Sequence, residues 1–346
     1  MQLNFNCAPT LIGSLPFTDP VAASGMLNKY LVDLPAWPQL PRRANLENMY
    51  IQYSEGFPGI EIDKEKIRFE RSADFDSKLE QLYADSCEDN RDSYPVSKEY
   101  AAGLYSFASS QQSKVPIAKG QLIGPVSWGL CVTDHSGKGI IYDDTLAEAI
   151  GRFLRLKASW QEKFLGSIAR RTVIFIDEPY LTSLGSAFIA LPNERISQLM
   201  SEVLAGISGI KGVHCCGATD WPLLLNLPID IISFDAYNYL DSILCYQSDL
   251  CSFVRKGKAI SWGIIPNDED LLKKESTATI YDRFAEALAP LTREGIPIRD
   301  LVRQSIITPT CGLASLSQDA VEHVLTLLNG VSDRIRRKYG SQNRLA

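Results

Sequence analysis

Short apolar runs that end in Gly, Pro or a polar residue recur along the chain, and stretches of helical length separate them. Between the runs, segments such as NERISQLMSEVLAGISGI have apolar residues at helical spacing. This alternation predicts a parallel sheet covered by helices, and therefore an α/β protein. The runs that we interpret as strands occupy residues 9–16, 117–127, 172–179, 212–217, 229–236, 259–266 and 305–313.

An eighth strand is expected near residues 30–41, where Pro and Trp obscure the pattern. Eight strands alternating with helices would close a (β/α)8 TIM barrel. The segment 59–96 is too charged for a barrel strand, and it reads as an exposed hairpin and helix inserted after the second strand. Because no linker, low-complexity tract or repeat divides the chain, we expect residues 1–346 to form a single TIM-barrel domain with this insertion.

The composition is that of an ordinary globular protein, with 45% hydrophobic and 22% charged residues. A net charge of -6 without a dense Lys/Arg cluster argues against a nucleic-acid partner. No apolar run approaches the length of a membrane span, and the start MQLNFNCAPT lacks the pattern of an export signal, so we expect a cytoplasmic protein. In that reducing compartment the eight cysteines are expected as core residues, metal ligands or catalytic groups rather than disulfides.

Polar residues with metal-binding side chains fall at the ends of three predicted strands: His214, Cys215 and Cys216 at the fifth, Asp235 at the sixth and Cys311 at the eighth. In a barrel these ends converge on one face. Side chains two apart on a strand point the same way, so His214 and Cys216 can share a target while Cys215 points into the wall. The set suits tetrahedral zinc. From the residues alone, Cys311 could equally be a core cysteine and Asp235 a helix cap.

Six motifs carry a resemblance to a known family: LIGSLPFT, KGQLIGPVS, FIDEP, HCCGATDW, IISFDA and TPTCGL. They occur in the same order as the motifs of the catalytic domain of cobalamin-independent methionine synthase. The chain resembles still more the short core methionine synthases, and the similarity runs from about residue 9 to 330. The resemblance implies a zinc ion held by His214, Cys216, Asp235 and Cys311, although the long enzymes have Glu where this chain has Asp235.

The implied activity is transfer of a methyl group to the thiolate of homocysteine, which gives methionine. Thiolate ligands make the zinc site electron-rich, which favours alkyl transfer to sulfur over hydrolysis. By resemblance, Asp177 and Ser14 hold the amino and carboxylate groups of homocysteine, and Glu47 or Glu55 supplies a further acid. Without the resemblance, Asp177 could equally be a structural hydrogen-bond acceptor.

The methyl donor is inferred from an absence. The long enzymes place a His near the end of the seventh strand to protonate methyltetrahydrofolate, but this chain has Asn267, Asp268 and Glu269 in WGIIPNDED. His135 is expected in a surface loop and His323 in the final helix. We therefore expect methylcobalamin, or a methylated corrinoid protein, as donor. Candidates for an aromatic rim around this donor, or for simple packing, are Trp128, Trp221, Tyr237 and Tyr239.

Three other functions fit parts of the pattern. A corrinoid:coenzyme M methyltransferase on the same barrel would share the zinc ligands but bind a sulfonate thiol. A uroporphyrinogen decarboxylase relative would need no zinc and an arginine-rich pocket. A non-catalytic corrinoid carrier would present a His to cobalt within a Rossmann-like domain, a pattern that this sequence lacks.

Overall fold

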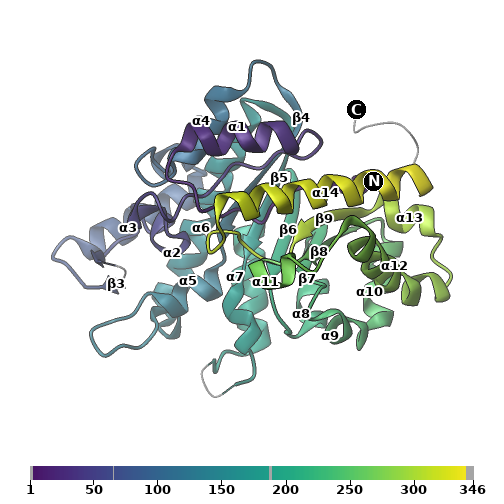
Figure 1. Ribbon diagram of the computed structural model, residues 1–346. Coiled ribbons are helices and arrows are strands. Elements are labelled where there is room, and N and C mark those ends of the chain that lie inside the picture. Colours follow the sequence, from purple (N-terminus) through teal and green to yellow (C-terminus); the bar gives the residue numbers. More distant parts are fainter. Residues whose placement is uncertain (1–2, 65, 187–188, 340–346) are drawn as a thin grey trace.

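A curled parallel sheet of seven strands forms the centre of the fold, with helices packed around it (Figure 1). The structure is a computed structural model that describes residues 3–64, 66–186 and 189–339. The strands follow the order β1-β9-β8-β7-β6-β5-β4. Their bounds are β1 (Ala8–Pro9), β4 (Val115–Ile123), β5 (Ala169–Asp177), β6 (Ile210–Cys215), β7 (Ile231–Asp235), β8 (Ala259–Ile265) and β9 (Ser305–Pro309).

The two edge strands, β1 and β4, are connected through residues 35–39, which we call the seam segment. Ala36 forms an isolated parallel bridge with Lys119 of β4, and Gln39 forms another with Ser14, beyond the end of β1. Two backbone hydrogen bonds join the seam segment to the β1 side, from Gln39 N to Gly13 O at 3.0 Å and from Leu15 N to Gln39 O at 2.9 Å. The strand expected at residues 30–41 is therefore present only as single bridges.

The eight-stranded barrel expected from the sequence is thus not formed by the strands of the described residues. Proline explains the difference, because Pro35, Pro38 and Pro41 lack the amide hydrogen that a regular ladder requires. The first expected strand, at 9–16, is also shorter than predicted, since only Ala8–Pro9 pairs regularly with β9. The other six expected strands coincide with β4 to β9.

Helices cover the outer face of the sheet and bury a large apolar core against it. Among them, α6 packs against both β4 and β5, and α14 contacts β1, β8 and β9. The helices are α1 (Pro20–Tyr30), α2 (Met49–Gln52), α3 (Phe75–Glu88), α4 (Ala102–Ser110), α5 (Pro125–Cys131), α6 (Asp144–Gly166), α7 (Asn193–Ala205), α8 (Trp221–Leu225), α9 (Leu240–Leu244), α10 (Gln247–Arg255), α11 (Glu269–Leu272), α12 (Thr277–Arg293), α13 (Ile298–Arg303) and α14 (Gln318–Tyr339). Short 3-10 helices occur at η1 (Asn45–Glu47), η2 (Arg91–Ser93), η3 (Ile140–Tyr142) and η4 (Pro179–Ser183).

A second, smaller apolar cluster fills the inside of the curled sheet near the amino ends of its strands. It includes Ile117 of β4, Phe175 of β5, Ile231 of β7 and Ile306 of β9. Residues two further along a strand point to the same side, and these positions carry polar side chains, among them Lys119, Ser233 and Thr308. The inside of the sheet is therefore apolar at the amino end and becomes polar toward the carboxyl end.

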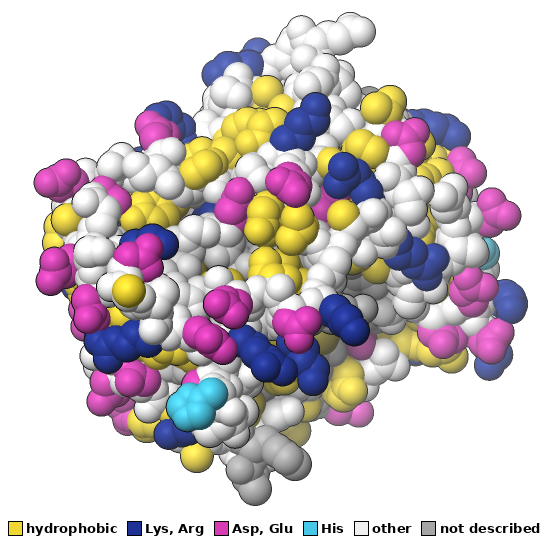
Figure 2. All heavy atoms as spheres, turned by 90° about the vertical axis from the view of Figure 1, so that its left-hand side faces the viewer, with side chains coloured by type: hydrophobic (Ala, Val, Ile, Leu, Met, Phe, Trp, Pro, Cys, Tyr) yellow, Lys and Arg dark blue, Asp and Glu magenta, His cyan; other side chains and the backbone are white. Residues whose placement is uncertain are grey.

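The charged segment at 59–96 does form a hairpin and a helix, as the sequence predicts. Strands β2 (Ile60–Asp63) and β3 (Lys66–Phe69) pair antiparallel, and α3 follows them. The hairpin lies on the side of the molecule remote from α10 and α13 (Figure 1). On the face that carries it, acidic and basic side chains are interspersed (Figure 2). Among the described residues, no helix combines the length and the apolar character that a membrane crossing needs.

The contact of α4 with the seam segment gives a test of the fold. A Cβ atom added to Gly103 in α4 would lie 1.9 Å from the carbonyl oxygen of Pro38, which is backbone and cannot move aside freely. We expect Gly103→Ala to lower the free energy of unfolding by about 1–3 kcal/mol, as overpacking does. Gly25 in α1 is the matched control, because a Cβ there meets nothing within 4 Å.

Urea unfolding of both variants would measure the difference. Gly25→Ala should be neutral or stabilising by up to about 1 kcal/mol, since alanine favours a helix over glycine. Equal effects of the two substitutions would contradict the close contact between α4 and the seam segment.

Candidate functional site

A cavity of about 430 Å³ lies at the carboxyl ends of the strands, the face where barrel-like α/β proteins place their chemistry. It is reached by residues from distant parts of the chain, from the loop after β1 to the turn after β9. The sequence-predicted residues that line it are Ser14, Glu47, Asp177, His214, Cys216 and Cys311. The structure therefore brings together most of the residues that the sequence singled out.

His214, Cys216 and Cys311 form a group of metal-binding side chains. Each offers one ligand atom, and these atoms all lie within 4.8 Å of one another. The Nδ1 atom of His214 is 3.0 Å from the hydroxyl of Ser233, so the ring orientation is fixed from behind. Its Nε2 atom is buried and has no hydrogen-bond partner. Such an unpaired buried nitrogen is expected where an imidazole is held ready to bind a metal.

The two adjacent cysteines at the end of β6 have different surroundings, as strand alternation predicts. Cys215 is fully buried in the outer core, and burial raises the pKa of its thiol to about 12. Cys216 lines the cavity, and the hydrogen bond from Cys311 lowers the pKa of its thiol. The same hydrogen bond, together with burial, raises the pKa of Cys311.

Asp235 lies outside this group of three. Its Oδ1 atom accepts a hydrogen bond from the backbone of Asn238 at 2.8 Å, and its Oδ2 atom accepts one from the Asn238 amide at 2.7 Å. The carboxylate thus holds the turn that follows β7, but it does not cap the following helix α9, whose N-cap residue is Tyr239. Asp235 as a zinc ligand stays a prediction from the resemblance alone.

Asp177, the last residue of β5, presents a carboxylate to the cavity. Its Oδ1 atom is buried and has no hydrogen-bond partner. Burial raises the pKa of this carboxyl to about 6, while the charges of His214 and Lys119 oppose that rise. Lys119 is itself buried, and its ammonium donates to Ile12 O at 2.7 Å and to Gln121 Oε1 at 3.1 Å. The site therefore holds a carboxylate that lacks a donor and a buried cation nearby.

Glu47 and Glu55, the two alternatives from the sequence, differ in their position relative to the cavity. Glu47 is fully buried at the cavity wall, with Oε1 accepting a hydrogen bond from Arg43 at 2.6 Å and Oε2 without a partner. Burial raises the pKa of its carboxyl. Glu55 instead accepts a hydrogen bond from the Ser97 amide at 2.8 Å and does not line the cavity. Of the two acids, only Glu47 therefore lines the cavity.

Glu178 is a buried acid next to the site that the sequence analysis missed. Its oxygens accept hydrogen bonds from the amides of Val126 and Ser127, at 2.9 and 2.8 Å, and from the Ser127 hydroxyl at 2.5 Å. Burial raises the pKa of its carboxyl to about 7. These bonds anchor the first turn of α5 to the end of β5. The signal in the sequence was the second acid of IDEP, which directly follows Asp177.

The predicted aromatic rim is wrong in part. Trp128 and Trp221 are fully buried, and each donates its indole hydrogen to a neighbouring oxygen, Tyr50 O and Ser242 Oγ. Tyr237 packs under Arg283, whereas Tyr239 is 41% exposed. Two other tyrosines lie at or near the cavity and were not predicted from the sequence. Tyr50 lines the cavity, and the ring centroid of Tyr180 lies 6.1 Å from that of Tyr50.

The acidic residues after β8 are used to build the turn. Asp268 caps α11 by accepting hydrogen bonds from the amides of Asp270 and Leu271. Glu269 accepts a hydrogen bond from the Ser317 amide at 2.8 Å. Neither carboxylate lines the cavity. The turn thus offers the cavity no acid in place of the missing histidine.

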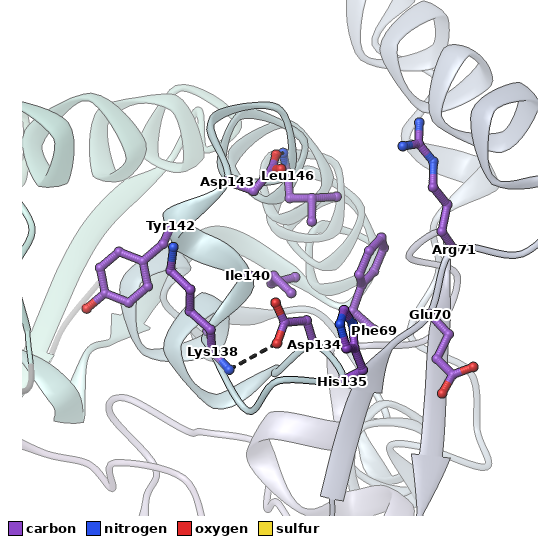
Figure 3. A pocket seen from close by; sticks show the side chains of 11 residues that line it. Phe69, Glu70, Arg71, Asp134, His135, Lys138, Ile140, Tyr142, Asp143 and Leu146 are labelled. Atoms are coloured by element: carbon purple, nitrogen blue, oxygen red, sulfur yellow. Dashed lines mark hydrogen bonds between the residues drawn. The ribbon is translucent and has the colours of Figure 1, made fainter.

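A second cavity, of about 500 Å³, lies between the end of β3 and the loop that follows α5 (Figure 3). Its lining mixes basic and acidic side chains, including Arg71, Lys138 and Asp134. Asp134 accepts hydrogen bonds from its own loop, for example from Lys138 N at 3.0 Å. His135 lies here, in a surface loop as expected, and His323 lies in α14. None of the predicted site residues lines this cavity.

Comparison with solved structures shows which fold the chain shares. A B12-independent methionine synthase from Shewanella sp. W3-18-1, solved in complex with selenomethionine, matches with a TM-score of 0.61 and 15% sequence identity over 96% of this chain and 98% of that one. A Listeria monocytogenes protein to which vitamin-B12-independent methionine synthase activity is provisionally assigned matches with a TM-score of 0.55 and 15% identity over 94% of this chain and 87% of that one. No protein-family model matches the chain, and neither does any curated protein sequence.

These similarities extend over nearly the whole chain, and they show a common fold at low sequence identity. Both similar proteins are described as B12-independent, whereas the sequence led us to expect methylcobalamin or a corrinoid protein as donor for this chain. What the comparisons establish is that the chain has the fold of proteins described as B12-independent methionine synthases.

Proposed function

We propose that the protein is a zinc-dependent methyltransferase that methylates the thiol of homocysteine and so forms methionine. The observation that carries the proposal is the meeting of His214, Cys216 and Cys311, with ligand atoms within 4.8 Å of one another, in the cavity that also holds the unpaired carboxylate oxygen of Asp177. The shared fold with methionine synthases supports the same reaction class.

The three side chains fit zinc by their chemistry. One imidazole and two sulfurs are preferred zinc ligands, and three protein ligands leave the fourth position of a tetrahedral site open, as catalytic sites do. The hydrogen bond between His214 Nδ1 and Ser233 leaves Nε2 as the ligand atom. When bound, zinc would supply the positive charge that keeps a substrate thiol in its nucleophilic thiolate form at neutral pH.

The carboxylates of the cavity suit the amino group of the substrate. An ammonium group carries three N–H donors, and Asp177 Oδ1 and Glu47 Oε2 are buried acceptors without partners. Ser14 at the same cavity offers a hydroxyl to the substrate carboxylate, as the resemblance implies. The Shewanella protein was solved with selenomethionine, an amino acid with the side-chain shape of the methylated product. The cavity therefore combines acceptors for an amino group, from Asp177 and Glu47, with the proposed zinc site for a thiol. This combination favours an amino acid thiol as substrate.

The alternative functions fit the cavity less well. A decarboxylase of propionate-rich substrates needs several arginines, and a sulfonate thiol needs a cation at the cavity wall. Among the described residues that line the cavity there is no arginine or lysine. The carboxyl groups in this lining belong to Glu47 and Asp177, and their negative charge disfavours both anionic substrates.

The direct test is methionine formation from homocysteine by the purified protein, with methyltetrahydrofolate and methylcobalamin offered in parallel as donors. We expect turnover that requires zinc and is lost after removal of the metal by a chelator and restored when zinc is returned. Because the proposal concerns the acceptor side, either donor would support it, and the comparison identifies the donor. Absence of turnover with both donors in a zinc-loaded protein would refute it.

The metal ligands can be tested without an assay of turnover. Zinc content should fall sharply in Cys216→Ala and Cys311→Ser, because each removes a ligand from the group of three. Cys215→Ala is the matched control. Cys215 lies at the end of the same strand but is buried in the outer core, so this variant should keep its zinc. Elemental analysis of the three variants measures this, and equal zinc loss in Cys215→Ala would contradict the assignment.

Asp177 is expected to bind the substrate rather than the metal. Asp177→Asn should raise the KM for homocysteine by about one to two orders of magnitude, because a charged hydrogen bond in a buried site contributes about 1.5–3 kcal/mol. Zinc content should not change. Glu55→Gln is the control, since Glu55 does not line the cavity and its loss should leave KM unchanged. Zinc loss in Asp177→Asn would show instead that Asp177 supports the metal group.

A further inference from the structure

The turn that carries Cys311 is held by the side chain of Asn267, which lies in the turn after the neighbouring strand β8. We propose that Asn267 is a positioning residue that sets Cys311 for metal binding. The inference rests on the proposed zinc site. It concerns the same turn after β8 in which the sequence analysis looked for a proton donor.

Asn267 contacts the residues on both sides of Cys311. Its amide nitrogen donates to the carbonyl oxygen of Gly312 at 3.3 Å. Its amide oxygen accepts a hydrogen bond from the hydroxyl of Thr310 at 3.0 Å. Both polar atoms of the side chain are thus directed at the Cys311 turn. Only a neutral amide can make this pair of bonds, because a carboxylate has no hydrogen to donate to Gly312.

The backbone cannot hold the turn in the same way. The amide of Thr310 donates to Ile265 O at 2.9 Å, which continues the pairing of β8 with β9 just beyond the last strand residue, Pro309. The residue after Ile265 is Pro266, which has no amide hydrogen. The regular ladder therefore stops before Cys311, and the side chain of Asn267 supplies the contacts that further ladder bonds would have made.

The opposite side of the turn is fixed by the loop after β1. The amide of Leu313 donates to Ser14 O at 2.8 Å. Gly312 packs so closely that a Cβ atom there would lie 2.1 Å from the Ser14 hydroxyl oxygen. With Ser14 on one side and Asn267 on the other, the turn has little freedom to shift, and Cys311 faces the other two ligands.

Cys311 needs this support more than the other two ligands do. His214 lies within β6 and Cys216 directly follows it, so the ladder places them, whereas Cys311 lies in a turn beyond the end of β9. Residues that hydrogen-bond around a metal ligand keep it in the productive orientation, and their loss typically weakens metal binding by about 10–100-fold. We expect an effect of this size when the amide of Asn267 is removed.

The experiment measures zinc affinity by competition with a chromophoric chelator. Asn267→Ala should bind zinc about 10–100-fold more weakly than the wild type. Asn226→Ala is the matched control, because the Asn226 amide also donates to a backbone carbonyl, Pro222 O at 2.9 Å, but at the exposed end of α8. That variant should keep wild-type affinity. Unchanged affinity in a folded Asn267→Ala, or equal weakening in Asn226→Ala, would overturn the proposal.

A second variant distinguishes the positioning of Cys311 by Asn267 from a general loss of protein stability. Thr310→Val removes one of the two bonds, so its zinc affinity should fall less than that of Asn267→Ala. Because Thr310 and Asn267 hold the turn through the same hydrogen bond, their effects should not add. The free energy of zinc binding lost in the double variant should be smaller than the sum of the losses in the two single variants. Cobalt substituted for zinc should show altered thiolate-to-metal absorption in Asn267→Ala. Strictly additive losses of zinc-binding free energy, together with an unchanged cobalt spectrum, would refute the positioning role of Asn267.

The outcomes for the two proposals are distinct. If the wild-type protein binds no zinc, the proposed function fails before any variant is compared. If the wild type binds zinc and Cys311→Ser does not, while Asn267→Ala binds as well as the wild type, the proposed function stands and only the role of Asn267 is rejected.

Discussion

The register of the parallel strands is the constraint on which the site depends. Asp177 of β5 pairs with His214 of β6, and His214 pairs with Ser233 of β7, so one row of the sheet contains the carboxylate, the imidazole and the hydroxyl that orients it. A slip of one residue in any of these strands would turn its polar side chain into the outer core. The apolar residues inside the amino end of the sheet oppose such a slip, because Phe175 and Ile231 would lose their packing with it.

The parts of the fold and the site that the sequence could predict are those governed by local periodicity. Strands β4 to β9 are rich in apolar residues and are followed by, or end in, Gly, Pro or a polar residue, so their existence and their common edge follow from the pattern. The period of two separates Cys216 from Cys215. Because parallel strands end at one edge, the meeting of His214, Cys216 and Cys311 could be expected from positions almost a hundred residues apart.

The parts that the sequence could not predict depend on contacts between distant segments. The prolines of the seam segment replace a strand by single bridges, and which neighbours it would meet is not encoded locally. Asp235 could be a ligand or a helix cap by its position in the chain, and the sequence did not predict its actual hydrogen bonds to Asn238, which hold the turn after β7. The burial of Trp128 and Trp221 likewise follows from tertiary packing, since a tryptophan near a strand end can face either way.

The pairing of β1 with β9 has a consequence for how the protein is made. Ala8 lies opposite Ile306, so the first strand finds its partner only after almost the whole sheet has been synthesised. The loop after β1 then receives Leu313 and fixes the turn of Cys311. A nascent chain that has reached β6 already contains His214 and Cys216, but it lacks Cys311 and the sheet edge that positions it. Assembly of the proposed zinc site is thus tied to the last stage of synthesis, when long-range closure of the sheet becomes possible.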